Sequence, residues 1–496
     1  MNTKLLINGE LIETQEKQAV INPSTEEVIT EVSVASTLEI EAAVHAARSA
    51  FDKGQWPRFS LEKRKEFILR IAQGILDNAQ ELASLETLNT GKPIKESTFM
   101  DIPSAAKTFE HFANSLESYL TSETITISAA TGSAQSTLLR EPLGVAVLIV
   151  PWNYPLLIAS WKMAQALAAG NTVILKPSSL TPLSALKLAQ IIADAGFPKG
   201  AVNVINGPGT TVGEMLCRDT RVDMISFTGS NEIGKQIIGN SIGSVKKMSM
   251  ELGGKSAAIV LKDADLEVAV NGSLCSIFLN QGQMCTAMSR LLVQDEIYDA
   301  FLKGFVAKAK RIALGNGSDF ETQMGPLISQ IQRQKVLAYV KKAESQGAKL
   351  LCGGRIPTDS RLRKGFFFEP TVFGEVTPGM TLFQEEVFGP VACVSRFSKV
   401  EEAIALANST EFGLAASIWT KDVTQARYVA CGLHAGTVWV NTYGMFYNEV
   451  PYGGFKQSGF GKELGKEGFL EYTRLKNFLV DTTEDSKPLV NYWYGF

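Results

Sequence analysis

From about residue 143, short apolar runs alternate with segments of helical periodicity. The apolar runs are VAVLIV (145–150), NTVILKP (171–177), VNVING (202–207) and MISFTGS (224–230), and helical patterns fall at 155–169, 182–195, 210–217 and 232–240. This alternation is typical of a parallel sheet that helices cover on both faces. It therefore restricts this part of the chain to an α/β architecture.

A second alternating series begins near SAAIVLKDADLEVAV (256–270) and extends to GTVWVN (436–441). Ahead of the first series, a short N-terminal hairpin is followed by helical patterns at 38–54, 61–90 and 101–120. A chain of 496 residues is too long for one ordinary core. Two series therefore predict two α/β domains.

Two stretches belong to neither series, TSETITISAATGSAQSTLLRE (121–141) and TRLKNFLVDTT (473–483). Both alternate like exposed strands, and an exposed strand usually needs a partner edge. We expect them to pair with each other and with another subunit.

Composition excludes several classes of protein. A net charge of −3 without a Lys/Arg run argues against nucleic-acid binding. The most apolar stretch, 145–170, is interrupted by Pro151, Asn153, Pro155 and Lys162, so no membrane span of about 20 residues is predicted. The N-terminus lacks the pattern of a signal peptide. Six scattered cysteines without a CxxC predict no metal site, no disulfide scaffold and a cytoplasmic location.

Three Gly- or Ser-containing turns at predicted strand ends could bind phosphate or ribose. NGPGTTVGEML (206–216) misses the dinucleotide fingerprint by one residue, and an ordinary turn explains it equally well. FTGSNEIG (227–234) places Gly229 and Ser230 at a helix N-terminus, which favours a pyrophosphate. ILKPSSLTP (174–182) offers Lys176 at the end of a strand, where open α/β sheets bind ligands.

One cysteine lies in an unusual setting, NQGQMCTAMSR (280–290), and no histidine is near Cys285 in the sequence. A buried thiol without function and a nucleophile are both possible on this evidence. A free thiol is only about 3% ionised at pH 7, so a nucleophile here needs an activating group.

Six motifs occur in one order along the chain. They are PWNYP (151–155), KPSS (176–179), FTGS (227–230), ELGGKS (251–256), GQMC (282–285) and EEVFGP (385–390). This set, with the tail 451–478, resembles the aldehyde dehydrogenase superfamily over essentially the whole chain. PWNYPLLIASWK is most similar to the bacterial betaine-aldehyde and aminoaldehyde branches.

The resemblance implies oxidation of an aldehyde to a carboxylate through a cysteine thiohemiacetal, hydride transfer to a nicotinamide cofactor and thioester hydrolysis. It assigns the nucleophile to Cys285 and the general base to Glu251. The side chain of Asn153 and the backbone N–H of Cys285 would form the oxyanion hole, in which one donor is typically worth about 3–4 kcal/mol. Acyl transfer to coenzyme A and a non-catalytic binding protein on the same scaffold are the alternatives.

The resemblance also implies a cofactor site and a homo-oligomer, dimer or tetramer. The cofactor residues would be Trp152, Lys176, Ser179, Gly209, Gly213, Phe227, Gly229, Ser230, Leu252, Gly253, Glu386 and Phe388. Glu385 competes with Glu386 for its role. Strictly NAD-dependent relatives often carry Glu where this chain has Ser179, and a carboxylate there would repel the 2′-phosphate of NADP. We expect dual use of NAD and NADP.

The implied substrate is a small-molecule aldehyde in an aromatic tunnel. Its lining would be Tyr154, Trp161, Met284, Thr286, Phe446, Glu449 and Tyr452. Rings could hold a cationic head group through cation–π contact, and Glu449 could pair with a cationic aminoaldehyde if it faces the tunnel. The chain departs from the betaine-aldehyde pattern at Tyr452, Gly444 and Glu449, where those relatives typically carry Trp, His and Gln. A broad range of apolar or aromatic aldehydes is equally compatible, and Glu449 could face solvent.

The expected fold class is therefore α/β, with two open α/β domains, a Rossmann-like cofactor domain and a catalytic domain, plus a small β oligomerisation extension. The NAD(P)-binding domain would comprise 1–120 and 142–254, the catalytic domain 255–455, and the oligomerisation or bridging strands 121–141 and 470–496.

Overall fold

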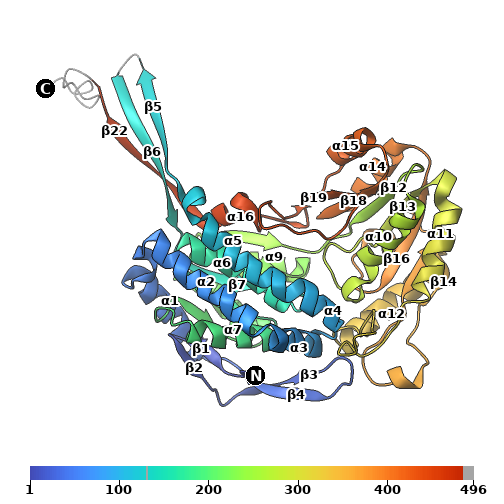
Figure 1. The fold of residues 1–496 in the computed structure, drawn as a ribbon, viewed down its shortest axis with the longest axis horizontal. Helices are drawn as coiled ribbons and strands as arrows, with labels where there is room; N and C mark the ends of the chain where they lie inside the picture. Colours follow the sequence, from blue (N-terminus) through green and yellow to red (C-terminus); the bar gives the residue numbers. More distant parts are fainter. Residues whose placement is uncertain (130–131, 484–496) are drawn as a thin grey trace.

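The computed structural model describes residues 1–129 and 132–483, so parts of the predicted stretches 121–141 and 470–496 lie outside the described residues. Two helix-covered sheets lie side by side, and a narrow β-ribbon projects from the first (Figure 1). This arrangement confirms the predicted α/β fold class.

Eight strands form the first sheet. Their order is β2 (Glu10–Ile12), β1 (Leu5–Ile7), β9 (Val202–Val204), β8 (Thr172–Lys176), β7 (Val145–Ile149), β10 (Met224–Thr228), β11 (Lys247–Glu251) and β21 (Gly459–Phe460). The five strands from β9 to β11 are parallel, β1 is antiparallel to β9 and to the edge strand β2, and β21 forms an antiparallel edge beside β11. The central strands are buried on both faces, which explains their continuous apolar runs.

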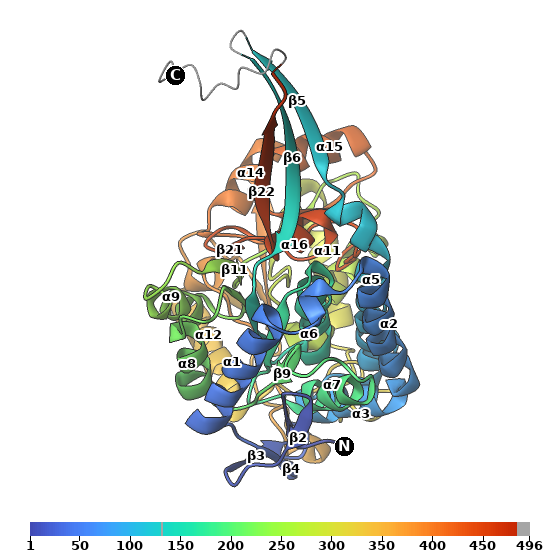
Figure 2. The ribbon, with the colours of Figure 1, turned by 90° about the vertical axis from the view of Figure 1, so that its left-hand side faces the viewer.

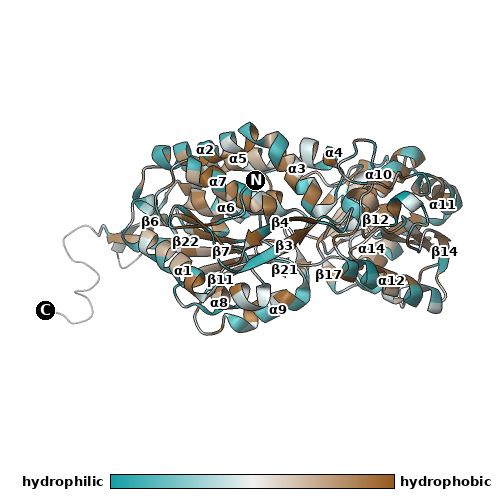
Figure 3. Cartoon of the chain, turned by 90° about the horizontal axis from the view of Figure 1, so that it is seen from below, coloured by the Kyte–Doolittle hydropathy of each residue, from teal (hydrophilic) through white to brown (hydrophobic). Residues whose placement is uncertain are grey.

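Helices cover both faces of this sheet. One face carries α2 (Leu61–Asp77), α3 (Ala79–Thr90), α5 (Ile102–Leu120), α6 (Pro155–Ala169) and α7 (Leu183–Asp194), and the other carries α1 (Thr37–Asp52), α8 (Glu214–Arg218) and α9 (Asn231–Asn240) (Figure 3). The pattern at 61–90 forms two helices because Asn78 ends α2 and precedes α3. The short helix α4 (Ile94–Glu96) and a π-turn (Ser97–Asp101) lead into α5. No helix among the described residues has the length and apolarity to cross a bilayer.

The second sheet has seven strands. Their order is β14 (Lys349–Cys352), β15 (Thr371–Gly374), β16 (Val391–Phe397), β13 (Arg290–Gln294), β12 (Ala257–Val260), β18 (Ala415–Trp419) and β19 (Thr437–Val440), of which only β14 is antiparallel. One apolar core holds α10 (Leu266–Phe278) and α11 (Asp295–Ala309), and a second holds α12 (Gln330–Ser345), α13 (Thr381–Gln384), α14 (Val400–Asn408) and α15 (Val423–Gly432).

Small elements join the two halves. The hairpin β3 (Lys17–Ile21) and β4 (Val28–Ser33), which the sequence did not predict, reaches the second half where Pro23 O accepts from Phe366 N at 2.9 Å. The strands β17 (Phe412–Gly413) and β20 (Phe455–Lys456) form a two-stranded sheet. After β20 the chain returns to the first half, where β21 pairs with β11 and α16 (Gly465–Glu471) packs on α6.

The projecting ribbon consists of β5 (Glu123–Ala129), β6 (Gly132–Pro142) and β22 (Thr473–Asp481) (Figure 2). β6 is the central strand and pairs antiparallel with both neighbours. The predicted pairing of the two stretches with each other is confirmed. Contact with another subunit stays a prediction.

Asn171 ties three segments of the first half together. Its buried side chain accepts from Gly144 N at 2.9 Å and donates to Ala166 O at 3.1 Å and to Tyr472 O at 2.9 Å. These bonds hold the start of β7, the end of α6 and the start of β22 at one point. Each buried group left unpaired costs about 1–3 kcal/mol.

The substitution Asn171→Ala should therefore lower the free energy of unfolding by roughly 3 kcal/mol or more. Urea unfolding monitored by circular dichroism measures this loss. Asn271→Ala, which removes an exposed amide bonded only to Lys308 Nζ, is the matched control and should change stability by less than about 0.5 kcal/mol. Equal midpoints for the two variants would contradict this role of Asn171.

Candidate functional site

Cys285 follows a sharp turn at the end of α10. The turn Leu279–Gly282 holds Asn280 and Gln281 at φ of 47° and 58°, in the left-handed region. Gly282 also has a positive φ, and a Cβ on it would lie 2.2 Å from Gly389 O. The turn ends the helix abruptly and leaves Cys285 half-buried between the two sheets.

The thiol of Cys285 has one close polar neighbour, because its Sγ lies 3.4 Å from the hydroxyl of Tyr452. Burial raises the pKa of Cys285 to about 12, the hydrogen bond from Tyr452 lowers it, and the charges of Glu386 and Glu251 raise it further. The thiol is therefore protonated at neutral pH until a base or a bound ligand changes its surroundings.

Glu251 is the last residue of β11 and is buried. Burial raises the pKa of Glu251 well above its ordinary value, and the negative charge of Glu463 adds to the shift. A Cβ on Gly453 would lie 2.7 Å from Glu251 Oε1, so the absence of a side chain at Gly453 leaves room for this carboxyl group. A carboxyl group with a raised pKa can accept a proton near neutral pH, as a general base must.

A buried ion pair lies on the inner side of Glu251. Lys162 Nζ is 2.5 Å from Glu463 Oε1 and donates to Ser226 Oγ at 2.7 Å, and Gln165 Nε2 donates to Glu463 Oε2 at 2.9 Å. Lys162 and Gln165 come from α6, whereas Glu463 belongs to the returning C-terminal segment. Sequence analysis did not single out Glu463, because no local pattern marks a partner some 300 residues from Lys162.

Asn153 lies in the loop between β7 and α6 and is buried. Its Nδ2 donates to Gln283 O at 2.8 Å, and its backbone oxygen accepts from Asn280 Nδ2 at 3.1 Å. An amide nitrogen carries two hydrogens. One of the two is used by Gln283 O, which leaves the second for a ligand.

Aromatic rings surround the approach to Cys285. Phe446 lies at the centre, 5.5 Å from Trp161, 5.2 Å from Tyr452 and 5.5 Å from Trp439, and Trp161 lies 5.7 Å from Tyr452, between ring centroids. We call Trp161, Trp439, Tyr443, Phe446 and Tyr452 the aromatic box.

Two members of the aromatic box, Trp439 and Tyr443, were missed by sequence analysis. The hydroxyl of Tyr443 lies 3.2 Å from Thr286 Oγ1 and 3.7 Å from Met284 Sδ, so the predicted neighbours of the nucleophile both contact it. The signal that could have revealed them is the aromatic cluster that begins in the predicted strand 436–441 and continues directly after it.

Two other predicted tunnel residues lie beside ionisable side chains. The ring of Tyr154 faces the ammonium of Lys92, with Nζ 3.9 Å from the ring centroid. The side chain of Glu449 is 69% exposed, and its Oε1 lies 3.8 Å from His111 Nδ1. This exposure fits the alternative in which Glu449 faces solvent.

Lys176 ends β8, at the carboxyl edge of the first sheet. Its Nζ donates to Pro177 O at 3.1 Å, and burial lowers the pKa of Lys176 to about 8. An ammonium has three donors, so two remain for a ligand. Gly213 faces it, since a Cβ there would lie 3.6 Å from Lys176 Cε, and a Cβ on Gly209 would meet only open space. Ser179 is half-buried, and its backbone oxygen accepts from Gln18 Nε2 at 2.8 Å.

The next turn along the sheet edge begins at Phe227. A Cβ on Gly229 would lie 2.4 Å from Phe227 Cζ, so only glycine fits between this ring and α9. Ser230 caps α9 through Ile233 N at 3.4 Å. Leu252, directly after Glu251, is buried and packs against Gly234 of α9.

Glu386 approaches the same edge from the second half. Its Oε1 accepts from Gly254 N at 3.0 Å, and a Cβ on Gly253 would lie 2.6 Å from its Oε2. Burial raises the pKa of Glu386 to about 7. Glu385, its predicted competitor, instead accepts from Tyr339 OH at 2.9 Å. Beyond them, Phe388 has a φ of 57° and packs edge-to-face on Trp152 at 5.2 Å.

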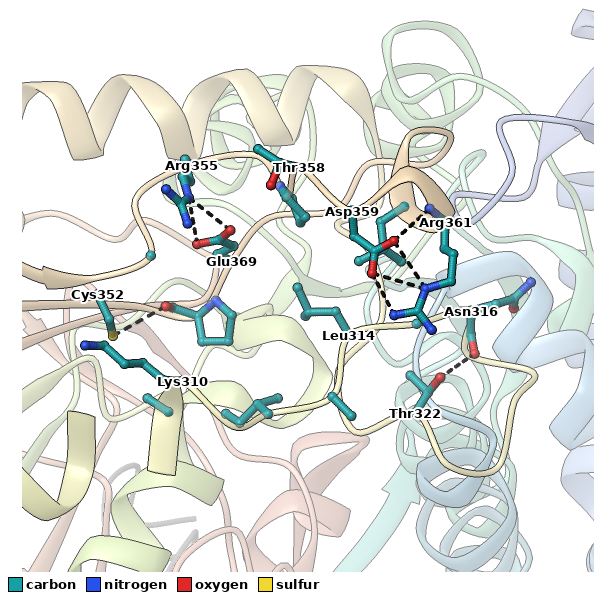
Figure 4. Close-up of a pocket in the computed structure, with 18 of the residues that line it drawn as sticks. Lys310, Leu314, Asn316, Thr322, Cys352, Arg355, Thr358, Asp359, Arg361 and Glu369 are labelled. Carbon is teal, nitrogen blue, oxygen red and sulfur yellow. Dashed lines mark hydrogen bonds and ion pairs between the residues drawn. The ribbon is translucent and has the colours of Figure 1, made fainter. Parts of the chain in front are cut away.

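A groove of about 1060 Å³ lies elsewhere, between α11, β14 and the loop before β15 (Figure 4). Four of its charged side chains form two ion pairs, Arg355 with Glu369 and Arg361 with Asp359. None of its lining residues belongs to the site around Cys285. Across residues 1–129 and 132–483, no cluster of His, Cys, Asp and Glu has the geometry of a metal site.

Comparison with known proteins identifies the family. The model of the aldehyde dehydrogenase family matches residues 11–478. The betaine aldehyde dehydrogenase of Bacillus subtilis is 47% identical over 497 residues, with 100% of each chain covered. The mitochondrial aldehyde dehydrogenase of Homo sapiens is 43% identical over 462 residues, covering 93% of this chain and 88% of its own.

Solved structures agree with this result. The betaine aldehyde dehydrogenase of Staphylococcus aureus in complex with NAD⁺ superposes with a TM-score of 0.95 at 40% identity, covering 100% of this chain and 97% of that one. A crystal of a variant of that protein contains NAD⁺ and a cysteine modified by β-mercaptoethanol. The chain therefore belongs to the aldehyde dehydrogenase family, which confirms the resemblance and the aldehyde-oxidising activity expected from its sequence.

Proposed function

We propose that Cys285 is the nucleophile of an NAD-linked aldehyde oxidation. The observation that carries this proposal is the position of its thiol, half-buried between the aromatic box and the loop of Asn153. Attack of the thiolate on the aldehyde carbon forms a C–S bond and places a negative charge on the former carbonyl oxygen. The free N–H of Asn153 and the backbone N–H of Cys285 stabilise that charge.

Glu251 is the proposed general base. It takes a proton from the water that cleaves the thioester, and its raised pKa makes this transfer favourable near neutral pH. Acyl transfer to coenzyme A does not need this base, so the buried carboxyl group supports the hydrolytic reaction over that alternative.

The residues at the sheet edge fit a nicotinamide dinucleotide. Lys176 keeps two unused donors, and Gly209 and Gly213 leave open space beside it. Glu386 would hold the nicotinamide ribose, with Phe388 against the ring. When bound, the cofactor accepts a hydride from the substrate carbon. NAD⁺ complexes of the relatives support NAD as cofactor.

We propose that NADP is also used, because Ser179 has no charge to oppose a 2′-phosphate. The substitution Ser179→Glu should lower kcat/KM with NADP at least about fivefold, since repulsion at contact distance is roughly 1–4 kcal/mol. kcat/KM with NAD should stay the same or rise. Steady-state kinetics with both cofactors checks this, and Ser178→Glu is the adjacent control. Discrimination against NADP above about a thousandfold in the wild type would contradict dual use.

The thiol of Cys285 should become more reactive as pH rises, because its pKa lies near 12 and the thiolate is the reactive form. Alkylation by iodoacetamide should accelerate about tenfold per pH unit between pH 7 and 9. Tyr452→Phe removes the hydroxyl that lowers this pKa and should slow alkylation about tenfold, since a hydrogen bond to a charged group is worth about 1.5–3 kcal/mol. Tyr443→Phe, whose hydroxyl bonds Thr286, is the control. Equal rates in the Tyr452 variant and the wild type would refute the contact.

We propose a quaternary ammonium aldehyde such as betaine aldehyde as the substrate class. The aromatic box supplies several ring faces, and each ring that meets a cation contributes about 0.5–2 kcal/mol. The 47% identity to a betaine aldehyde dehydrogenase supports the same choice. Neutral apolar or aromatic aldehydes are the second candidate, because Glu449 points to His111 and solvent and thus supplies no charge to the box.

A matched pair of substrates separates these candidates. Betaine aldehyde and 3,3-dimethylbutanal have the same shape and differ in charge. Cation–π contact with two rings predicts a kcat/KM at least about fivefold higher for betaine aldehyde. Equal values would favour the range of neutral aldehydes.

Glu449→Gln should change the KM for an aminoaldehyde less than threefold, and a larger change would place this carboxylate at the tunnel after all.

We further propose a cytoplasmic homo-oligomer. The outer edge of β22 carries exposed apolar side chains, among them Leu475, Phe478 and Leu479. An exposed apolar edge strand is a template for pairing with another chain.

We also propose the division of the chain into domains, with boundaries at 120, 142, 254 and 455, and a bridging role for 470–496.

A further inference from the structure

Four ionisable side chains outside the proposed reaction are buried together near the site. They are Glu86 of α3, Lys92, Glu96 of α4 and Asp101. Lys92 Nζ lies 2.7 Å from Asp101 Oδ2, and both side chains are almost fully buried. Burial raises the pKa of Glu86 to about 7 and of Glu96 to about 8. At neutral pH Glu96 is therefore mostly protonated and uncharged.

Glu96 contacts the turn that carries the nucleophile. Its Oε1 accepts from the backbone N–H of Asn280 at 3.2 Å, and both residues are buried. Asn280 has a φ of 47°, a conformation that residues other than glycine rarely adopt. Its N–H points to Glu96 in this conformation, so the carboxyl group supplies the acceptor for a buried backbone donor in the turn after helix α10.

Two hydrogen bonds connect Asn280 with the oxyanion donor Asn153, one directly and one through Gln283. Asn280 Nδ2 donates to Asn153 O at 3.1 Å and to Gln283 O at 3.4 Å. Gln283 O also accepts from Asn153 Nδ2 at 2.8 Å. The orientation of the Asn153 amide is thus set by two atoms that Asn280 holds, and Asn280 is held by Glu96.

We propose that Glu96 is a positioning residue for the oxyanion hole, acting through Asn280 on Asn153. The inference rests on the proposed roles of Cys285 and Asn153. Glu96 itself touches neither substrate nor cofactor in this scheme. Its effect on rate arises because a displacement of about 1 Å in a catalytic group can cost about a hundredfold.

The variants follow from the geometry. Glu96→Gln keeps an oxygen that can accept the N–H of Asn280 and resembles the uncharged carboxyl group, whereas Glu96→Ala removes the acceptor. Asn280→Gly tolerates the left-handed backbone and removes only the side-chain bonds. Asn203→Ala is the control, because Asn203 is a buried side chain that likewise accepts one backbone N–H, from Asn8 at 2.9 Å, in a strand away from Cys285.

Steady-state kinetics with saturating NAD⁺ should show that Glu96→Ala lowers kcat at least about tenfold while KM for aldehyde and for NAD⁺ changes less than threefold. Glu96→Gln should recover kcat to within about threefold of the wild type, and Asn203→Ala should lose thermal stability without losing kcat. The double variant Glu96→Ala/Asn280→Gly should be no slower than the slower single variant, since both act on one path.

The inference is overturned if Glu96→Ala keeps kcat within threefold of the wild type, or if Glu96→Gln is as slow as Glu96→Ala. Failure of the proposed function is a separate result: the wild type would form no NADH from an aldehyde, or Cys285→Ala would retain activity. Alkylation of Cys285 at the wild-type rate in Glu96→Ala supports a defect in oxyanion stabilisation, and a rate more than tenfold lower would overturn it by placing the damage at the thiol.

Discussion

The close approach of two backbone segments between the sheets organises this molecule. The chain leaves the first sheet at Glu251 and enters the second at β12, and a Cβ on Gly254 would lie 2.5 Å from Cys285 O. A side chain at this position would force the nucleophile turn away from the first sheet. Because Gly253 and Gly254 have none, residues from both sheets meet within hydrogen-bonding distance of one another.

This close approach buries the ionisable side chains of the site and thereby shifts their pKa values. Cys285, Glu251 and Glu386 have raised pKa values and Lys176 has a lowered one, in each case chiefly through burial. All four shifts favour the uncharged form. Cys285, Glu251 and Glu386 therefore lose negative charge, whereas Lys176, whose pKa of about 8 lies above neutral pH, stays mostly an ammonium. The proposed reaction begins with a proton leaving the thiol. Two buried ion pairs, Lys162–Glu463 and Lys92–Asp101, lie close to the site.

The aromatic box shows how a substrate site forms from distant segments. Trp161 comes from α6, whereas Trp439, Tyr443, Phe446 and Tyr452 come from one stretch after β18. Trp439 lies in β19, and the other three rings are supplied by a segment with little regular structure, which β21 and α16 anchor to the first half. The shape of the box thus depends on the return of the C-terminal segment, and so does the contact between Tyr452 and Cys285.

Local chemistry in the sequence determined the elements, because continuous apolar runs predicted the buried strands of both sheets. Six motifs marked Cys285, Glu251, Asn153 and Lys176 through their resemblance to the aldehyde dehydrogenase superfamily. Only the tertiary structure decided which distant groups meet. Glu463 faces Lys162, Tyr443 bonds Thr286, Glu96 bonds Asn280, and Glu449 lies beside His111 at the surface. Periodicity carries information about neighbours three or four residues apart, whereas these contacts are set by how two sheets and a returning C-terminal segment pack.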